Sequence, residues 1–239
     1  INNFIVHVNL VIKDSCLNSK ERALRPEETI SFSVLGDYLA LTKPRLLFIV
    51  LISTLIGYLL PESSTIKITL LHLMIGTALT GGGAHALNQW LERVQDAQRK
   101  RTRERPLPSG RLRTEEALVF GSILSLIGIA YLWLTVNILT ASLGALTLTS
   151  YILVYTPLKR RTQLNTWLGA ITGALPPLMG WAAQQGTIDL ACLPIFAFLY
   201  FWQLPHFFAI AWMYREDYRR AGFRMLSLND ETGAKTGLQ

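Results

Sequence analysis

Three side chains that carry oxygen donors recur at intervals of four residues, where an apolar segment gives way to charged sequence. They are Asn88, Glu92 and Asp96. In a helix, a spacing of four advances little more than one turn, so the three line one stripe with about 6 Å of rise per step. Mg²⁺ takes oxygen ligands from carboxylates and from substrate phosphates. The stripe therefore predicts a divalent-metal site, although interfacial carboxylates neutralised by arginines are the commoner explanation for an arbitrary membrane protein.

A cationic segment follows the stripe directly. It runs from Arg99 to Gly110 and reads Arg-Lys-Arg-Thr-Arg-Glu-Arg-Pro-Leu-Pro-Ser-Gly. Arginine offers a planar fork to phosphate oxygens and lysine a compact charge, while the two prolines stiffen a turn that could hold both against an anion. The segment predicts a diphosphate-binding loop. The simpler alternative is a patch that only sets topology and contacts lipid.

The elements that position these residues are apolar. Most of them are long enough to cross about 30 Å of hydrocarbon as helices with a rise of 1.5 Å per residue. They are residues 46–60, 68–91, 117–135, 138–156, 164–183 and 190–213. Six such stretches in succession, with few interior charges, predict an all-α, polytopic membrane helical bundle.

Basic residues alternate between the loops of this predicted bundle. They precede the first span and follow the second, fourth and sixth, whereas the intervening turns carry few charges. Because short basic loops stay in the cytoplasm, we expect the stripe and the cationic segment on that side, where the formal charge of +7 also meets anionic membrane lipid. Nucleic acid is not an expected partner, since the basic residues border spans and no recognition module accompanies them.

Two histidines lie within the predicted spans. His85 precedes Asn88 by three residues on the same helix face, and His206 follows a proline inside the sixth span. A lone histidine is more often a hydrogen-bonded packing residue than a ligand. The segment Gly81-Gly82-Gly83 permits either close helix packing or access of a ligand to the backbone, and close packing is the stronger expectation.

A second acidic segment lies just past the sixth span. Its Asp217 is expected at a depth comparable to Asp96 on the same side of the membrane, so it could ligate a second metal or share the first. The alternative is an interfacial helix end, in which Tyr214 and Tyr218 act as aromatic anchors.

Residues 1–34 are predicted to form an N-terminal cytoplasmic tail ahead of a membrane domain over residues 35–239. The tail lacks the basic start and small-residue cleavage site of a signal peptide. Cys16 lies in the tail and Cys192 at the far end of the sixth span, so the membrane separates the two thiols and no disulfide is expected.

At these motifs the chain resembles the UbiA superfamily of intramembrane prenyltransferases, and within it the branch that farnesylates haem. The resemblance covers about residues 43–236. Its motifs are Asn88-x-x-x-Glu92-x-x-x-Asp96, Arg101-Thr-Arg-x-Arg105-Pro-Leu-Pro-x-Gly110, Tyr155-Thr-Pro-Leu-Lys-Arg160-Arg-Thr-x-Leu-Asn165, Gly173-Ala-Leu-Pro-Pro-Leu-x-Gly180-Trp181, Trp202-Gln-x-Pro-His206-Phe and Glu216-Asp217-Tyr-x-Arg-x-Gly222-x-x-Met225-Leu.

This resemblance implies a reaction and a set of site residues. Farnesyl diphosphate would bind through Mg²⁺ to two acidic motifs, and the farnesyl group would pass to a vinyl group of haem b with addition of water, which gives haem O. Carried onto this chain, the metal-binding and catalytic residues are Asn88, Glu92, Asp96 and Asp217. The candidates for the diphosphate are Lys43, Arg99, Arg103, Lys159 and Arg160, and those for contact with haem are His85 and His206.

The resemblance also implies about nine spans around a central cavity, of which this chain is expected to have six and to lack the last three. The expected location is the bacterial cytoplasmic (inner) membrane, and an association with haem A synthase or a terminal-oxidase assembly stays open, as does the prenyl chain length. Three alternatives remain: a prenyltransferase for an aromatic acceptor, a non-catalytic membrane protein or transporter, and a folded but inactive truncated chain. Magnesium-dependent release of diphosphate would distinguish the two prenyltransferases, for haem and for an aromatic acceptor, from the non-catalytic membrane protein or transporter.

Overall fold

The computed structural model describes residues 32–62 and 66–224, and every regular element in these two ranges is a helix. The chain forms two units, Ile1–Tyr38 and Leu39–Gln239. The expected tail therefore lies almost entirely outside the described residues, and its boundary stays a prediction. In order, the elements are α2 (Phe32–Leu41), α3 (Pro44–Leu59), α4 (Ile68–Gln98), α5 (Thr114–Thr135), α6 (Ile138–Thr149), η1 (Ser150–Tyr155), α7 (Thr156–Leu158), α8 (Asn165–Gln185), η2 (Leu190–Cys192), α9 (Leu193–Met213) and α10 (Arg215–Arg220).

Each of the six predicted apolar stretches is helical in the structure. The fourth is interrupted, because six residues between α6 and α7 form the π-helix η1. The helix α4 continues past its apolar part to Gln98, so Asn88, Glu92 and Asp96 share one uninterrupted helix as predicted.

The length and apolarity that a membrane span requires are confirmed for only part of the six. Three helical segments of the described chain are long and apolar enough to cross a membrane: Thr114–Thr135, Ile138–Leu158 and Leu190–Met213. A fourth qualifies if the bent pair Val34–Leu41 and Pro44–Leu59 counts as one span. Neither α4 nor α8 meets the same criterion of apolarity.

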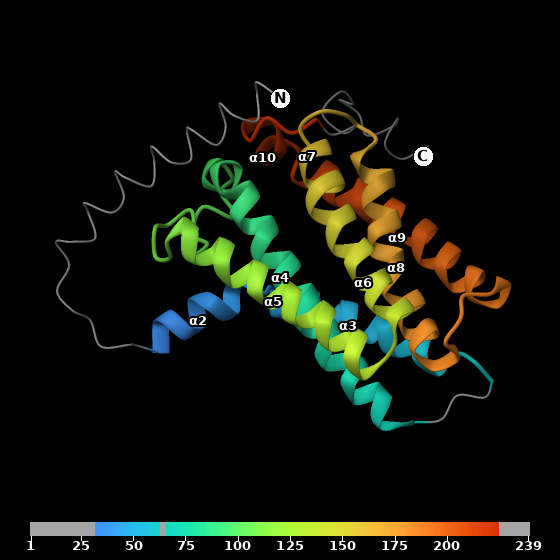
Figure 1. Ribbon diagram of the computed structural model, residues 1–239. Coiled ribbons are helices and arrows are strands. Elements are labelled where there is room, and N and C mark those ends of the chain that lie inside the picture. Colours follow the sequence, from blue (N-terminus) through green and yellow to red (C-terminus); the bar gives the residue numbers. More distant parts are fainter. Residues whose placement is uncertain (1–31, 63–65, 225–239) are drawn as a thin grey trace, which may run out of the picture. The chain divides into compact units, whose positions relative to one another are not determined.

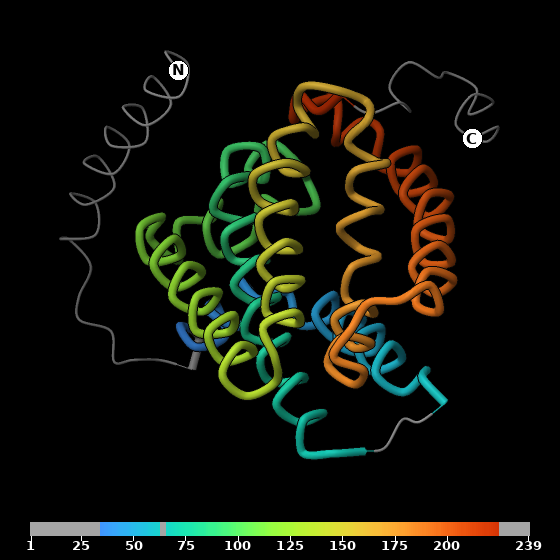
Figure 2. The backbone as a smooth tube through the Cα atoms, turned by 45° about the vertical axis from the view of Figure 1, so that its right-hand side comes forward, coloured from blue at the N-terminus to red at the C-terminus, as the bar shows by residue number. Residues whose placement is uncertain are grey.

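The physical reason lies in the position of α8 and α4 among their neighbours. In α8, 14 of 21 residues are buried, whereas in α9, of the same length, only three are. Figure 2 shows α8 running between α6 and α9, both of which it contacts. A helix shielded by other helices can carry glycine, threonine and amides, while one that faces lipid must be apolar all along its outer side.

Two glycines let the interior helices approach their neighbours closely. A methyl group on Gly83 of α4 would lie 2.6 Å from the backbone nitrogen of Ser125 in α5, and one on Gly180 of α8 would lie 2.6 Å from the backbone nitrogen of Tyr58 in α3. Small residues at such crossings are typical of helix packing in membranes. The expectation of close packing at the glycine segment is therefore confirmed for Gly83, while Gly81 lines the cavity described below.

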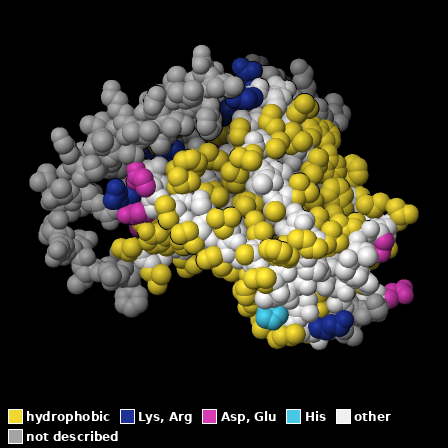
Figure 3. All heavy atoms as spheres, in the orientation of Figure 1, with side chains coloured by type: hydrophobic (Ala, Val, Ile, Leu, Met, Phe, Trp, Pro, Cys, Tyr) yellow, Lys and Arg dark blue, Asp and Glu magenta, His cyan; other side chains and the backbone are white. Residues whose placement is uncertain are grey.

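The loops that carry the basic residues meet at one end of the unit Leu39–Gln239. The end of α4, the short helix α7 and α10 lie together there (Figure 1), and the backbone N–H of Arg224 donates to the carbonyl of Lys159 at 2.8 Å. Hydrophobic side chains cover much of the outer surface in view, with charged groups toward its edges (Figure 3). This distribution fits a protein whose sides face lipid.

Candidate active site

A cavity of about 350 Å³ opens within this bundle. Its charged residues come from the start of α3, the end of α4, the following loop and the residue after α7. Its apolar and aromatic residues come mainly from α3, α4, η1, α8 and α9, and α6 contributes Thr147. The charged lining residues are Lys43, Glu92, Arg99, Arg101, Arg105 and Lys159, and the apolar and aromatic ones include Leu46, Val50, Tyr151, Tyr155, Pro176 and Phe207. One end therefore suits an anion and the rest an apolar chain.

The first two members of the predicted stripe face this cavity and are held by lysines. The Oδ1 atom of Asn88 accepts a hydrogen bond from Lys43 Nζ at 2.8 Å, and its Nδ2 donates to Thr156 Oγ1 at 3.1 Å. The Oε1 atom of Glu92 accepts from Lys159 Nζ at 2.8 Å. The stripe thus ties α4 to the start of α3 and to α7.

Asp96 has a different role from its two partners. Its side chain has no exposed surface and is paired with Arg99 and, at 2.9 Å, with Nη1 of Arg105. Its carbonyl also accepts from the hydroxyl of Thr102 at 2.8 Å. Asp96 is not among the cavity-lining residues, so in this structure it folds the cationic loop onto the end of α4.

Arg99 connects the carboxylates of the stripe. Its Nη2 atom pairs with Asp96 and lies 3.5 Å from Oε2 of Glu92. Its Nε atom is buried and makes no hydrogen bond, so a donor remains free on a side chain that lines the cavity. A phosphate oxygen could accept from that donor.

Charge controls the protonation of the pair at the end of the cavity, just beyond the predicted spans. Burial alone would raise the pKa of a carboxyl, but Lys159, Arg99 and Lys43 together hold the pKa of Glu92 below its ordinary value. Burial alone would lower the pKa of an amine, but Glu92 and the nearby tyrosines raise the pKa of Lys159 above its ordinary value. Both groups are therefore charged at neutral pH.

Lys43 reaches Asn88 from an unusual backbone conformation. It has a φ of 50° and is the only non-glycine residue with positive φ in the part of the chain that the structure describes. Such conformations cost free energy and concentrate at functional sites. Here the strained residue connects α2 to α3, and Pro44 follows it as the first residue of α3.

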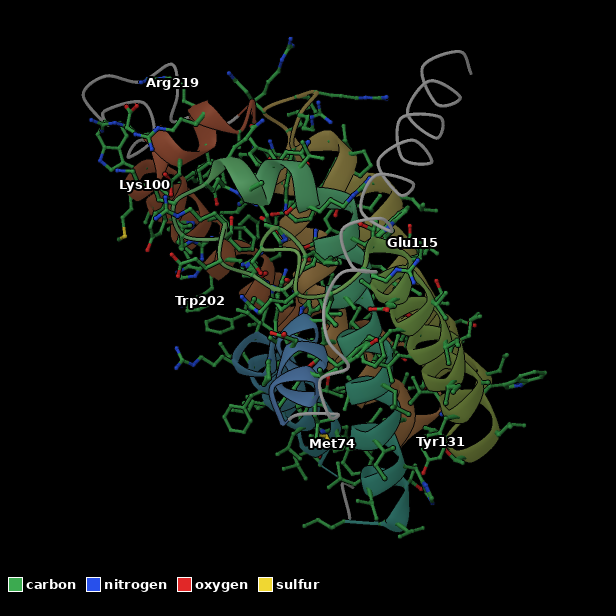
Figure 4. The ribbon with its side chains drawn as sticks, turned by 90° about the vertical axis from the view of Figure 1, so that its left-hand side faces the viewer. Met74, Lys100, Glu115, Tyr131, Trp202 and Arg219 are labelled. Atoms are coloured by element: carbon green, nitrogen blue, oxygen red, sulfur yellow. The ribbon has the colours of Figure 1, made fainter. Side chains whose placement is uncertain are left out.

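The second acidic segment packs against the cationic loop. The guanidinium of Arg99 lies 5.0 Å from the ring centroid of Phe223, and that of Arg101 lies 5.0 Å from the ring centroid of Tyr214. Figure 4 places Lys100 and Arg219 at one end of the helices and Met74 and Tyr131 toward the other. The structure therefore brings the two predicted motifs together.

Asp217 itself does not line the cavity. Its side chain is 16% exposed and lies 3.9 Å from Nη1 of Arg220, whereas its neighbour Tyr218 lines the cavity. Within the described residues, no group of three or more His, Cys, Asp or Glu side chains is arranged to hold a metal ion. Asn88 and Glu92 nonetheless have the oxygen donors that Mg²⁺ takes together with substrate phosphates, and a metal at Asn88 Oδ1 and Glu92 Oε1 would compete with the Lys43 and Lys159 amines.

The remaining candidates divide between the cavity and the surface. His85 lines the cavity, and its Nδ1 donates to the carbonyl of Thr42 at 2.8 Å. His206 is exposed on α9 and stacks on Trp202 with ring centroids 5.7 Å apart. Arg103 is also exposed, with Nε 3.8 Å from Glu104, and Arg160 is exposed beyond α7. These last three do not line the cavity, and their roles stay predictions.

Several cavity residues were not predicted. Arg101 and Arg105 lie in the cationic loop, but nothing in the sequence distinguishes them from Arg103. Tyr151 was treated only as part of an apolar span, and Tyr155 only as part of that span and as the start of a motif of the resemblance, although with Thr147 and Lys159 they recur at intervals of four. That spacing, one helical face that ends in a lysine, is the signal that could have identified them.

Comparison with known proteins assigns the sequence to one family. The model of the UbiA prenyltransferase family matches residues 50–236. The chain belongs to the UbiA prenyltransferase family. It is therefore a transferase enzyme, and both acidic segments and the cationic loop lie within the matched range.

Two bacterial relatives are similar over most of the chain. A protein named protoheme IX farnesyltransferase from Solibacter usitatus is 50% identical over 213 residues, which cover 85% of this chain and 73% of that protein. A protein of the same name from Opitutus terrae is 42% identical over 213 residues, which cover 89% of this chain and 71% of that protein.

A solved structure supports the fold of the family. A UbiA homologue from Archaeoglobus fulgidus, bound to DMAPP and Mg²⁺, superimposes with a TM-score of 0.68 at 14% sequence identity and covers 81% of this chain and 69% of that chain. At this identity the likeness concerns the fold alone, and it confirms the expectation of a UbiA-type helical bundle.

Proposed function

We propose that this chain transfers a farnesyl group from farnesyl diphosphate to a vinyl group of haem b, with addition of water, to give haem O and diphosphate. The observation that carries the proposal is the 50% identity, over 85% of the chain, to a protein named protoheme IX farnesyltransferase. The cavity supports it, since a cationic end beside an apolar interior suits a diphosphate that carries a long prenyl chain.

The diphosphate binds at the charged end of the cavity. Lys43, Lys159 and Arg99 line it, and Arg105 joins them from the loop. Preorganised cations stabilise the negative charge that builds on the leaving diphosphate as the carbon–oxygen bond breaks. Burial of the reacting carbon among apolar side chains keeps water away from the allylic cation until the acceptor has reacted.

Asn88 and Glu92 would contribute oxygen ligands to Mg²⁺ at the same end of the cavity, and Asp96 and Asp217 would support them from the two acidic segments. When bound, the metal would supply positive charge to the phosphate oxygens. The lysines that hold Asn88 and Glu92 in this structure would then pair with the diphosphate. The basic loops predict that this site faces the cytoplasmic side of a bacterial inner membrane.

The test is the formation of haem O in membranes of a host that lacks this pigment. The parent chain is expressed beside Glu92→Gln, which keeps the shape of the side chain and removes its charge, and beside Glu104→Gln, the same change at an exposed residue outside the cavity. We expect haem O with the parent and with Glu104→Gln, and a loss of about 100-fold or more with Glu92→Gln, similar to removal of one transition-state contact.

Two results would contradict the proposal. If Glu92→Gln forms haem O at the parental level, the site around Glu92 does not take part in the reaction. Magnesium-dependent release of diphosphate from farnesyl diphosphate with an aromatic acceptor, but not with haem b, would show that the acceptor is wrong while the enzyme class is right.

A further inference from the structure

Two side chains of α4 bind the backbone of residues 40–43, the turn that joins α2 to α3. The Nε2 atom of Gln89 donates to the carbonyl of Ala40 at 3.1 Å and to that of Leu41 at 2.9 Å. The Nδ1 atom of His85 donates to the carbonyl of Thr42 at 2.8 Å. A carbonyl can only accept, so these contacts fix which way the Gln89 amide points and which nitrogen of His85 carries the proton. Three consecutive carbonyls of the turn are therefore bound to one helix.

The carbonyls of this turn need partners from another element. The helix α2 ends at Leu41, and the last four carbonyls of a helix have no partner within it. Leu41 has no exposed surface, and Gln89 is only 2% exposed. A buried carbonyl without a hydrogen bond is costly, so the turn depends on the amide of Gln89.

The last residue of the turn, Lys43, has a backbone conformation that its local sequence does not favour. Its φ of 50° and ψ of 65° lie in the left-handed region, which few residues other than glycine adopt. Pro44 follows it, and a residue before proline prefers an extended backbone. Such a conformation persists only where the surrounding structure holds it. The hydrogen bonds from α4 to the three preceding carbonyls supply that support.

The turn directs the ammonium of Lys43 into the charged end of the cavity. Lys43 lines the cavity, and its Nζ donates to Oδ1 of Asn88 at 2.8 Å. One short stretch of α4 thus holds both parts of this residue, because Asn88 binds the ammonium while His85 and Gln89 bind the backbone before it. With an extended backbone at Lys43, the side chain would leave the turn in another direction and lose this position.

We propose that Gln89 and His85 are positioning residues, which hold Lys43 in its left-handed conformation so that its ammonium meets the diphosphate. The inference rests on the proposed function, in which Lys43 binds the diphosphate. The ammonium then passes from Asn88 to a phosphate oxygen while the turn stays in place. A cation that is already in position does not have to be ordered when the substrate binds, and this lowers the free-energy cost of binding. The role accounts for His85 without a contact to haem.

A double-mutant cycle tests this role through the binding of inorganic diphosphate with Mg²⁺. The variants are Gln89→Met, which keeps the length of the side chain and removes its donors, Lys43→Met, which removes the ammonium, and the combination of the two. Gln95→Met makes the same change at another buried glutamine of α4, outside the cavity. The unfolding temperature of each variant is measured beside its affinity for diphosphate.

We expect Lys43→Met and Gln89→Met each to weaken the binding of diphosphate by about 10-fold. Because Gln89 acts through Lys43, Gln89→Met should change the affinity by less than about twofold once Lys43 has been replaced by methionine. Gln95→Met should stay within about twofold of the parent. A general loss of stability would instead weaken binding by the same factor in both backgrounds.

Two substitutions of His85 test the turn independently of Gln89. His85→Asn keeps an N–H donor near the position of Nδ1, whereas His85→Leu removes every donor. We expect His85→Asn to retain the affinity for diphosphate within about threefold and His85→Leu to lose about 10-fold. Equal affinities in the two variants would show that the bond to Thr42 does not position Lys43.

The outcomes separate this inference from the proposed function. If Lys43→Met weakens binding but Gln89→Met does not, or if their effects are additive, the positioning role of Gln89 is wrong while the anion site stands. If Lys43→Met binds diphosphate as the parent does, Lys43 is not part of the anion site, and the inference falls with that part of the proposed function. A parent chain that shows the coupling but makes no haem O would contradict the acceptor alone.

Discussion

Lys159 connects a carboxylate, an aromatic ring and the cavity in the candidate site. It pairs with Glu92 at 2.8 Å, lies over the Tyr155 ring and lines the cavity. In Lys159→Met, Glu92 loses its closest partner and the diphosphate loses a cation, so kcat/KM for farnesyl diphosphate should fall by about 100-fold. Diphosphate release with haem b as acceptor measures this. Arg161→Met, an exposed neighbour outside the cavity, should stay within about twofold, and equal losses in the two variants would argue against the site.

Substitution of Arg105 and of Arg103 distinguishes the effect of the loop's folded geometry from that of its charge alone. Arg105 pairs with the fully buried Asp96 at 2.9 Å, whereas Arg103 is exposed and lies 3.8 Å from Glu104. We expect Arg105→Gln to lower the free energy of unfolding by about 1–3 kcal/mol, because Asp96 then keeps only Arg99, and to weaken substrate binding more than Arg103→Gln does. Thermal unfolding in detergent and KM measure the two effects. A larger loss of affinity in Arg103→Gln would restore the original prediction for that residue.

Among the elements, the contact between α4 and α5 depends on a glycine that the sequence indicated. A methyl group on Gly83 would lie 2.6 Å from the backbone nitrogen of Ser125, but one on Gly82 would meet only side chains, the nearest at 3.3 Å. Gly83→Ala should therefore destabilise the protein by about 1–3 kcal/mol and Gly82→Ala by clearly less, since side chains can shift and backbone cannot. Unfolding temperatures of both variants test this, and equal shifts would contradict the packing argument.

Helix positions were predictable from the sequence because apolar runs and four-residue spacings are local. They correctly placed Asn88, Glu92 and Asp96 on one helix. The sequence did not show how far α8 is shielded by other helices, since burial by neighbouring helices is a tertiary property. Nor did it show that Arg105 turns back to Asp96, which depends on a loop closed by hydrogen bonds from the Arg111 and Leu112 N–H groups to the carbonyl of Pro106. Tyr151 was missed because its four-residue spacing from Tyr155 and Lys159 lies within an apolar span, where the aromatic residue alone does not stand out.

At the scale of the whole molecule, the cavity is strongly unbalanced in charge. Five cationic side chains line it, namely Lys43, Arg99, Arg101, Arg105 and Lys159, against the single carboxylate of Glu92. The buried Asp96 offsets part of this excess from behind the loop. Like charges gathered in one cavity repel each other, so the free protein is destabilised and gains most from a polyvalent anion.

Inorganic diphosphate with Mg²⁺ should therefore stabilise the protein against thermal unfolding, even without a prenyl chain. At a ligand concentration about 100 times its dissociation constant, the gain is about 2.7 kcal/mol. Mg²⁺ alone should have a much smaller effect. Lys159 is bonded to Oε1 of Glu92, Arg99 lies 3.5 Å from its Oε2, and Lys43 is bonded to Oδ1 of Asn88 until the diphosphate attracts these cations. In Lys159→Met, the stabilisation by Mg²⁺ alone and that by Mg²⁺ with diphosphate should become more similar. The substitution frees Glu92 for the metal and also weakens the anion site. Mg²⁺ alone could instead stabilise the protein as much as the mixture of Mg²⁺ and diphosphate does. That result would show that the lysines do not keep the metal from Glu92, and that the metal and the diphosphate bind independently.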